Sequence, residues 1–178
     1  MFKEERDHPK FKWEDLGNIE MGRPNLGQSV PVRAYRLLQY TFRDILISEI
    51  GVDKTNDIII KAGRLAGSQF CENMLNKNLG FDEFVAELQR TLKEQSIGIL
   101  RVEEVDLQQM RMTLTVAEDL DCSGLPFTDE VVCHYDEGFI AGILEEYTGK
   151  HFSAKEIDCW ANGDRVCRFD VSIIKEKE

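Results

Sequence analysis

The chain has 178 residues, a size typical of one domain, and carries a formal net charge of −11 from 22 basic and 33 acidic residues. This charge disfavours binding to a nucleic-acid backbone, which needs a basic face. Hydrophobic residues make up 42% of the chain, no apolar run is as long as a membrane span, and the N-terminus lacks the apolar stretch of a secretion signal. With five cysteines and no such signal, we expect a cytoplasmic protein in a reducing compartment.

The first 31 residues show weak periodicity and contain several glycines and prolines. We interpret residues 1–31 as an N-terminal arm with a short extended piece near Ile19–Arg23, and residues 32–178 as the folded domain. Phe11 and Trp13 of the arm can pack either on the core of the same chain or on a second subunit. Both interpretations remain open at this point.

Three amphipathic helices are predicted over residues 32–50, 54–76 and 81–95, because apolar residues recur there at helical spacing. In the second helix, Gly63 and Gly67 lie four residues apart and allow another backbone to come close. We expect them to serve tight helix packing, since neither the spacing nor the following residues match a nucleotide-binding loop.

Strands are predicted over residues 97–105 and 110–117, and in the second of them apolar and polar residues alternate. A helix over residues 128–147, capped by a threonine and stopped by a glycine, follows. The last two strands are predicted over residues 151–161 and 165–174. This order predicts an α+β fold in which helices cover one face of a four- or five-stranded antiparallel sheet.

The pattern Cys-x22-Glu-x2-Cys-x7-Cys places Cys133, Glu156, Cys159 and Cys167 as one candidate site. Asn, Gly and Asp at positions 162–164 favour a tight hairpin turn, which would set Cys159 opposite Cys167 with Cβ atoms about 4.5–5.5 Å apart. Cys133 would reach the hairpin from the preceding helix. Glu156 lies three positions before Cys159, so a regular strand would point it to the other face. It can join the site only if the strand bends or bulges, or if it lies in the lead-in to the strand.

Three interpretations of this cluster compete. Zinc accepts both thiolate and carboxylate ligands, so a site with three sulfurs and one oxygen is chemically reasonable. The cysteines can equally be ordinary buried residues, or Cys159 and Cys167 can form a disulfide, which a reducing compartment disfavours. We assign the remaining cysteines, Cys71 and Cys122, to packing.

The C-terminal run EIDCWANGDRVCRF, residues 156–169, resembles the signature of the 4-vinyl reductase domain family. This family includes the hydrocarbon-sensing input domains of phenol- and xylene-responsive bacterial activators. The set of Cys133, Glu156, Cys159 and Cys167 is similar to the zinc-ligand pattern of the phenol-sensing members. The resemblance covers roughly residues 35–174, and implies a fold like that of TRAPP-type vesicle-tethering subunits and haem nitric-oxide sensor domains. A zinc ion with four protein ligands has no open position, so it is expected to be structural.

We expect the N-terminal helices and the sheet to enclose an apolar pocket, the usual form of a small-molecule site. Its candidate lining residues are Tyr35, Phe42, Phe70, Met74 and Phe84. The leading hypothesis is therefore a zinc-stabilised protein that binds or senses a small hydrophobic or aromatic ligand. The chain has no evident DNA-binding segment, so a signal would pass to a partner protein.

Two alternative functions and a homodimer are also considered. The name of the family suggests reduction of a vinyl group on a tetrapyrrole, a reaction that needs a hydride or electron source; the chain shows no nicotinamide or flavin motif. A ligand-delivery or assembly subunit is the third possibility. The apolar arm with Phe11 and Trp13, together with the Gly63 and Gly67 surface, predicts a homodimer.

Overall fold

The computed structural model describes residues 5–174. Its helices and strands, in chain order, are η1 (Trp13–Leu16), α1 (Ile19–Gly22), α2 (Val32–Ile50), α3 (Val52–Met74), α4 (Phe81–Glu94), β1 (Ile99–Asp106), β2 (Arg111–Ala117), α5 (His134–Thr148), β3 (Phe152–Asp158), η2 (Trp160–Asn162) and β4 (Cys167–Ile173). Across this described range, we find no helix with the length and apolar character needed to cross a membrane. The three predicted N-terminal helices and the first two predicted strands are confirmed to within a few residues.

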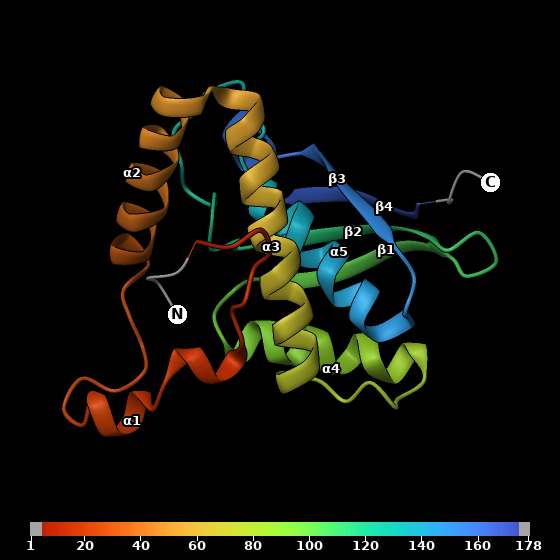
Figure 1. Cartoon of the computed structure of the whole chain (residues 1–178). Helices are drawn as coiled ribbons and strands as arrows, with labels where there is room; N and C mark the ends of the chain where they lie inside the picture. The colour runs from red at the N-terminus through yellow and green to blue at the C-terminus, as the bar shows by residue number, and fades with distance from the viewer. Residues whose placement is uncertain (1–4, 175–178) are drawn as a thin grey trace.

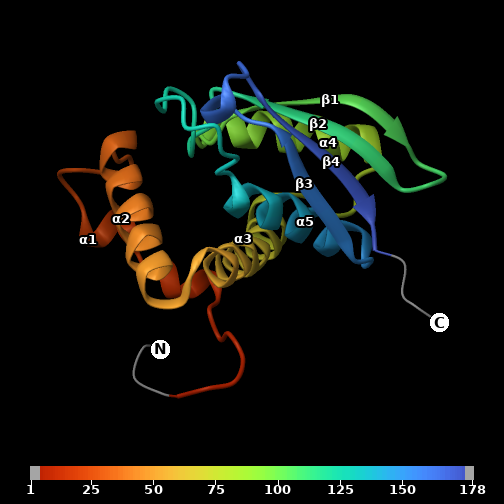
Figure 2. The ribbon, with the colours of Figure 1, turned by 90° about the horizontal axis from the view of Figure 1, so that it is seen from above.

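The strands form one antiparallel sheet in the order β1-β2-β4-β3. Helices α4 and α5 cover one of its faces, and α3 packs on the far side of α5 (Figures 1 and 2). The covered face is apolar, since Leu114 of β2 and its partner Phe169 of β4 are both buried. The predicted α+β architecture with a helical layer on one face is thus confirmed, with four strands.

Four glycines hold α3 against α5. Gly63 and Gly67 of α3 face Gly138 and Gly142 of α5, and a Cβ added to Gly67 would lie 2.1 Å from the carbonyl oxygen of Phe139. The two backbones are therefore in direct contact, which no larger residue allows. This confirms that Gly63 and Gly67 serve tight helix packing. Because α5 of the same chain covers them, these glycines do not form a surface for a second subunit.

The predicted start of the Cys133 helix is wrong. The helix begins at His134, with Cys133 as its N-cap, and not near Thr128. The backbone N–H of Thr128 instead donates to the carbonyl oxygen of Ala161 at 2.8 Å, which ties this segment to the β3–β4 connection. Asp129 has a φ of 59°, a left-handed conformation that a right-handed helix cannot include.

Two other local predictions are also corrected. The segment Ile19–Arg23 is not extended: residues 19–22 form α1, whose N-terminus is capped by the Asn18 side chain, which accepts from the Met21 N–H at 2.8 Å. The last hairpin is shorter than predicted, since β3 ends at Asp158 and β4 begins at Cys167. Residues 160–162 form a 3₁₀ turn in place of strand pairing.

Candidate functional site

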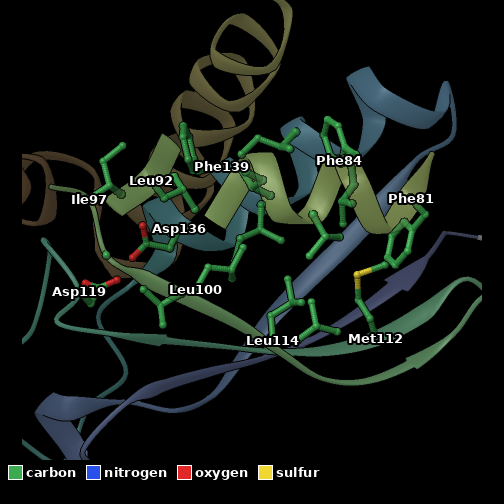
Figure 3. Close-up of a pocket in the computed structure, with 18 residues that line it drawn as sticks. Phe81, Phe84, Leu92, Ile97, Leu100, Met112, Leu114, Asp119, Asp136 and Phe139 are labelled. Atoms are coloured by element: carbon green, nitrogen blue, oxygen red, sulfur yellow. The ribbon is translucent and has the colours of Figure 1, made fainter. Parts of the chain in front are cut away.

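An apolar cavity of about 50 Å³ lies between α4, α5 and the sheet strands β1 and β2 (Figure 3). Its walls include Phe84, Leu88 and Leu92 of α4, Leu100 of β1, and Met112 and Leu114 of β2. A water needs roughly 10–15 Å³ of such space, so the cavity has room for several waters but little to bind them along these walls. An apolar guest suits it better than water does.

Two carboxyl groups close one end of this cavity. Figure 3 shows Asp119 and Asp136 side by side near Ile97, at the end opposite Phe81 and Met112. Asp119 follows β2, and Asp136 lies in the first turn of α5. Each of the two offers an oxygen within 4.8 Å of the other. The cavity is therefore polar at one end only.

The two acids differ in how their oxygens are bonded. Asp119 Oδ1 accepts the backbone N–H groups of Asp121 at 2.8 Å and Cys122 at 3.0 Å. Asp136 lines the cavity, and its buried Oδ2 has no hydrogen-bond partner among the described residues. Burial, with a smaller contribution from neighbouring negative charges, raises the pKa of Asp136 well above its usual value and that of Asp119 to about 6.

Helix α2 holds the loop that carries Asp119. The hydroxyl of Tyr35 donates to Asp121 Oδ1 at 2.8 Å, and that of Tyr40 donates to the Asp121 carbonyl at 2.9 Å. Arg36 Nε donates to the carbonyl of Leu120 at 2.8 Å. The polar end of the cavity and helix α2 are thus linked by direct hydrogen bonds.

The structure does not gather the five predicted pocket residues in one place. Phe84 lines the apolar cavity. Tyr35 and Phe42 line a separate hollow between α2 and α3, Phe70 lines a third beside the arm, and Met74 packs partly buried against the core. The sequence analysis did not predict Asp119 or Asp136 as pocket residues. Asp136 lies three positions after the predicted ligand Cys133, at the same end of α5, and this spacing is a signal that could have found it.

Four cysteine sulfurs meet at the end of the sheet nearest the loop after β2, which carries Asp119. Cys122, Cys133, Cys159 and Cys167 are fully buried, and their Sγ atoms all lie within 4.8 Å of one another. The Sγ of Cys133 lies 3.9 Å from that of Cys159 and 3.7 Å from that of Cys167, and the Cys122 and Cys167 sulfurs are 3.0 Å apart. Sulfurs on a tetrahedral zinc ion, with Zn–S bonds near 2.3 Å, would be about 3.8 Å apart. The two distances from Cys133 match this value and the Cys122–Cys167 distance is shorter, so the four sulfurs could hold a metal ion once Cys122 and Cys167 move slightly apart.

Strand order explains why these cysteines converge. Cys167 begins β4 opposite Val116 near the end of β2, so the loop after β2 brings Cys122 beside it. Cys159 directly follows β3, where its N–H donates to Asn162 Oδ1 at 3.1 Å. Hydrogen bonds from the neighbouring thiols, that of Cys122 foremost, lower the pKa of Cys159. The pKa values of Cys122, Cys133 and Cys167 are raised, so without a metal ion Cys159 is the cysteine that favours the thiolate.

Glu156 lies beside the sulfurs but is not one of the four clustered donors. Its Oε2 accepts the backbone N–H of Cys133 at 3.1 Å, which anchors the start of α5 to β3. Its Oε1 has no hydrogen-bond partner among the described residues, and burial raises its pKa to about 8. Cys122, which sequence reasoning assigned to packing, occupies the fourth corner. All five cysteines are free, so no Cys159–Cys167 disulfide is present.

Comparison with known proteins identifies the family. The model of the 4-vinyl reductase domain matches residues 112–173, from β2 to β4, a span that contains all four clustered cysteines. The uncharacterized protein MJ1642 of Methanocaldococcus jannaschii is 30% identical over 153 residues, covering 86% of this chain and 84% of that protein. The chain belongs to the 4-vinyl reductase domain family. The resemblance seen in its C-terminal run is thereby confirmed.

Two solved structures share the fold. A vinyl-4-reductase family protein from M. jannaschii has a TM-score of 0.58 at 17% identity, covering 84% of this chain and 85% of that one. The phenol-responsive sensory domain of the transcription activator PoxR, solved with phenol, has a TM-score of 0.60 at 15% identity, covering 84% and 77%.

The two other predicted fold relatives are matched as well. A trafficking protein particle complex subunit 3 from Naegleria fowleri has a TM-score of 0.60 at 14% identity, covering 80% of this chain and 97% of that one. An H-NOX protein from S. oneidensis has a TM-score of 0.50 at 8% identity, covering 77% and 74%. At these identities the likeness concerns the fold alone.

Proposed function

We propose that this member of the 4-vinyl reductase domain family is a cytoplasmic binding and sensing module whose small hydrophobic or aromatic ligand occupies the cavity between α4, α5 and the sheet. The observation that carries the proposal is the cavity itself, which has apolar walls and one polar end. Two fold relatives, the PoxR sensory domain with phenol and the trafficking subunit covalently bound to palmitic acid, hold apolar or aromatic molecules. The shared fold supports the same use here.

The four-cysteine cluster is proposed to hold a structural zinc ion. Zinc accepts four thiolates in a closed tetrahedral site, and a closed site has no position for a substrate. We place Cys122 as the fourth ligand in preference to Glu156, because the Cys122 sulfur lies within 4.8 Å of the other three sulfurs and Glu156 is not part of that group. When bound, zinc would tie the loop after β2, the start of α5 and both ends of the β3–β4 connection together.

The same loop connects the ligand, the metal and the outer helix. Asp119 faces the cavity, Cys122 belongs to the sulfur cluster, and Asp121 receives hydrogen bonds from Tyr35 and Tyr40 of α2. A ligand that shifts Asp119 would therefore move the surface of α2 by direct contacts. We propose that this is how occupancy reaches a partner protein.

Cavity occupancy can be tested by changing the volume at Leu88. Leu88→Trp is expected to fill the cavity and weaken phenol binding at least about tenfold in calorimetry, since overpacking leaves no room for the guest. Leu88→Ala enlarges the cavity and is expected to bind phenol at least as tightly as the parent. Leu107→Trp, at a position that is 54% exposed between β1 and β2 and does not line the cavity, is the matched control and should leave binding unchanged.

The same preparations separate the alternatives. Unchanged phenol binding in Leu88→Trp, with zinc content and circular dichroism as in the parent, would place the ligand elsewhere. Turnover of a vinyl tetrapyrrole with a reductant would favour the reductase alternative, and release of a bound ligand only to an acceptor protein would favour the delivery alternative.

A homodimer through α2 is proposed from the exposure of this helix. Helix α2 stands apart from the sheet and packs beside α3 (Figure 2). It also donates hydrogen bonds to the loop after β2, yet none of its residues is buried. Leu38, Phe42 and Ile45 are each at least 60% exposed, which is unusual for large apolar side chains gathered on one helix.

Charge placed on this face is expected to separate the subunits. Phe42→Glu should convert a dimer into a monomer in light scattering at micromolar concentration, because a carboxylate cannot be buried unpaired in an apolar contact. Leu107→Glu, at an equally exposed site in the β1–β2 turn, should remain dimeric. A monomeric parent protein would reject this assembly.

A further inference from the structure

We propose that the cavity selects its ligand by a hydrogen-bond-donating head group, which binds the Asp136 carboxyl while the apolar body lies along the walls of α4 and β2. This inference rests on the proposed function and names the class of ligand. It assigns Asp136 a role in specificity, discriminating hydroxyl- or amine-headed molecules from carboxylates.

The shape of the cavity sets the orientation of the guest. All the lining residues other than Asp119 and Asp136 are apolar or glycine, and the two acids lie together at one end (Figure 3). An apolar molecule with one polar group gains most when that group points to the acids. The reverse orientation would place the polar group between Phe81 and Met112, which offer only apolar surface to it.

Asp136 is the group that lacks a partner. Asp119 is satisfied in part by the N–H groups of Asp121 and Cys122, whereas the buried Oδ2 of Asp136 has no hydrogen-bond partner among the described residues. Buried polar oxygens in proteins are nearly always hydrogen-bonded. A carboxyl group keeps an accepting lone pair whether or not it is protonated. A donor on the ligand can therefore form a hydrogen bond to it in either state.

The surrounding charges favour a donor over an acid. The charges that raise the pKa of Asp136, after burial itself, are those of Asp119, Asp121, Cys167 and Glu156. No basic side chain appears among the described residues that line the cavity. A carboxylate head group would add a negative charge to a buried acidic end, whereas a hydroxyl or an ammonium group would not.

A series of ring compounds tests the donor. Phenol and toluene have nearly the same shape, and anisole keeps the oxygen of phenol without its proton. We expect calorimetry to show phenol binding about tenfold or more tightly than toluene and anisole, the ratio expected for one hydrogen bond to a buried, strongly polar acceptor. Benzoate should bind most weakly, and benzylamine should bind at least as tightly as toluene.

Variants at Asp136 show whether this residue carries the discrimination. Asp136→Leu should bring the phenol to toluene ratio close to one, with zinc content measured in each sample because the Cys133 sulfur is nearby. Asp136→Asn keeps an accepting oxygen without a charge, so it should preserve the phenol preference and reduce the discrimination against benzoate. Asp44→Asn on α2, which does not line the cavity, should change neither ratio.

The outcomes distinguish this inference from the proposed function. Equal binding of phenol, toluene and anisole to the parent protein, weakened by Leu88→Trp, would overturn the head-group inference and leave the cavity site standing. This comparison needs no variant at Asp136, so it decides the matter even if Asp136→Leu does not fold. Absence of binding by every ring compound would overturn both.

Discussion

Replacing Cys159 with Ser is expected to release the zinc ion and to destabilise the protein by at least about 4 kcal/mol, less than the roughly 10–16 kcal/mol of binding free energy typical of structural zinc sites. For a chain of this length, that corresponds to a fall in melting temperature of roughly 8–16 °C, at about 2–4 °C per kcal/mol. The reason is that three buried sulfurs lose their common ion where the loop after β2, α5 and the β3–β4 connection meet. Elemental analysis and calorimetric melting measure the two effects.

The matched control is Cys71→Ser. Cys71 is also fully buried but lies on α3, outside the sulfur cluster. It should keep one zinc ion per chain and lose only about 1–3 kcal/mol, the cost of burying a hydroxyl without a partner. Equal melting temperatures of zinc-loaded and chelator-stripped parent protein would contradict a structural metal.

Because protons compete for thiolates, zinc should also be released more readily as the pH falls.

Replacing Gly67 with Ala should destabilise the protein by about 3 kcal/mol or more, although alanine is the better helix former. The added Cβ would lie 2.1 Å from the Phe139 carbonyl oxygen, so α3 and α5 would have to separate. Gly22→Ala in α1 is the control, since nothing lies within 4 Å of its Cβ position, and it should change stability by less than about 1 kcal/mol. Urea unfolding compares the two variants, and a Gly67→Ala protein as stable as the parent would refute direct backbone contact.

The spacing of apolar residues predicted helices well where a single helical period runs through the segment. Helical spacing located the three N-terminal helices, and the pair Gly63 and Gly67 correctly indicated close helix packing. The predicted start of α5 was wrong because Asp129 adopts a left-handed backbone conformation. The acidic residues that suggested the first turn of a helix give no sign of this conformation. The prediction of strand pairing up to residue 161 was also wrong, because residues 160–162 form a 3₁₀ turn. Turn-forming residues at 162–164 suit several loop geometries, so they did not specify this one.

The candidate site depended on long-range order that no local pattern contains. Cys122 comes beside Cys167 because β2 pairs with β4, a neighbour that is not adjacent in the sequence. Glu156 was predicted as a ligand from spacing, and its side-chain Oε2 accepts the backbone N–H of Cys133. The apolar periods identified the buried faces of α3 and α4, whereas the apolar stripe of α2 is exposed. They could not show that the cavity lies between α4 and β2 and not between α2 and α3.

The most direct test of ligand binding in the cavity is a methyl spectrum of the protein labelled with ¹³C at its methionines. Met112 lines the cavity, whereas Met21 is 78% exposed on α1 and serves as the internal reference. On titration with phenol, the Met112 methyl signal should shift saturably, with the same dissociation constant that calorimetry gives, and the Met21 signal should stay in place. Saturable phenol binding with an unmoved Met112 signal would contradict the proposed site.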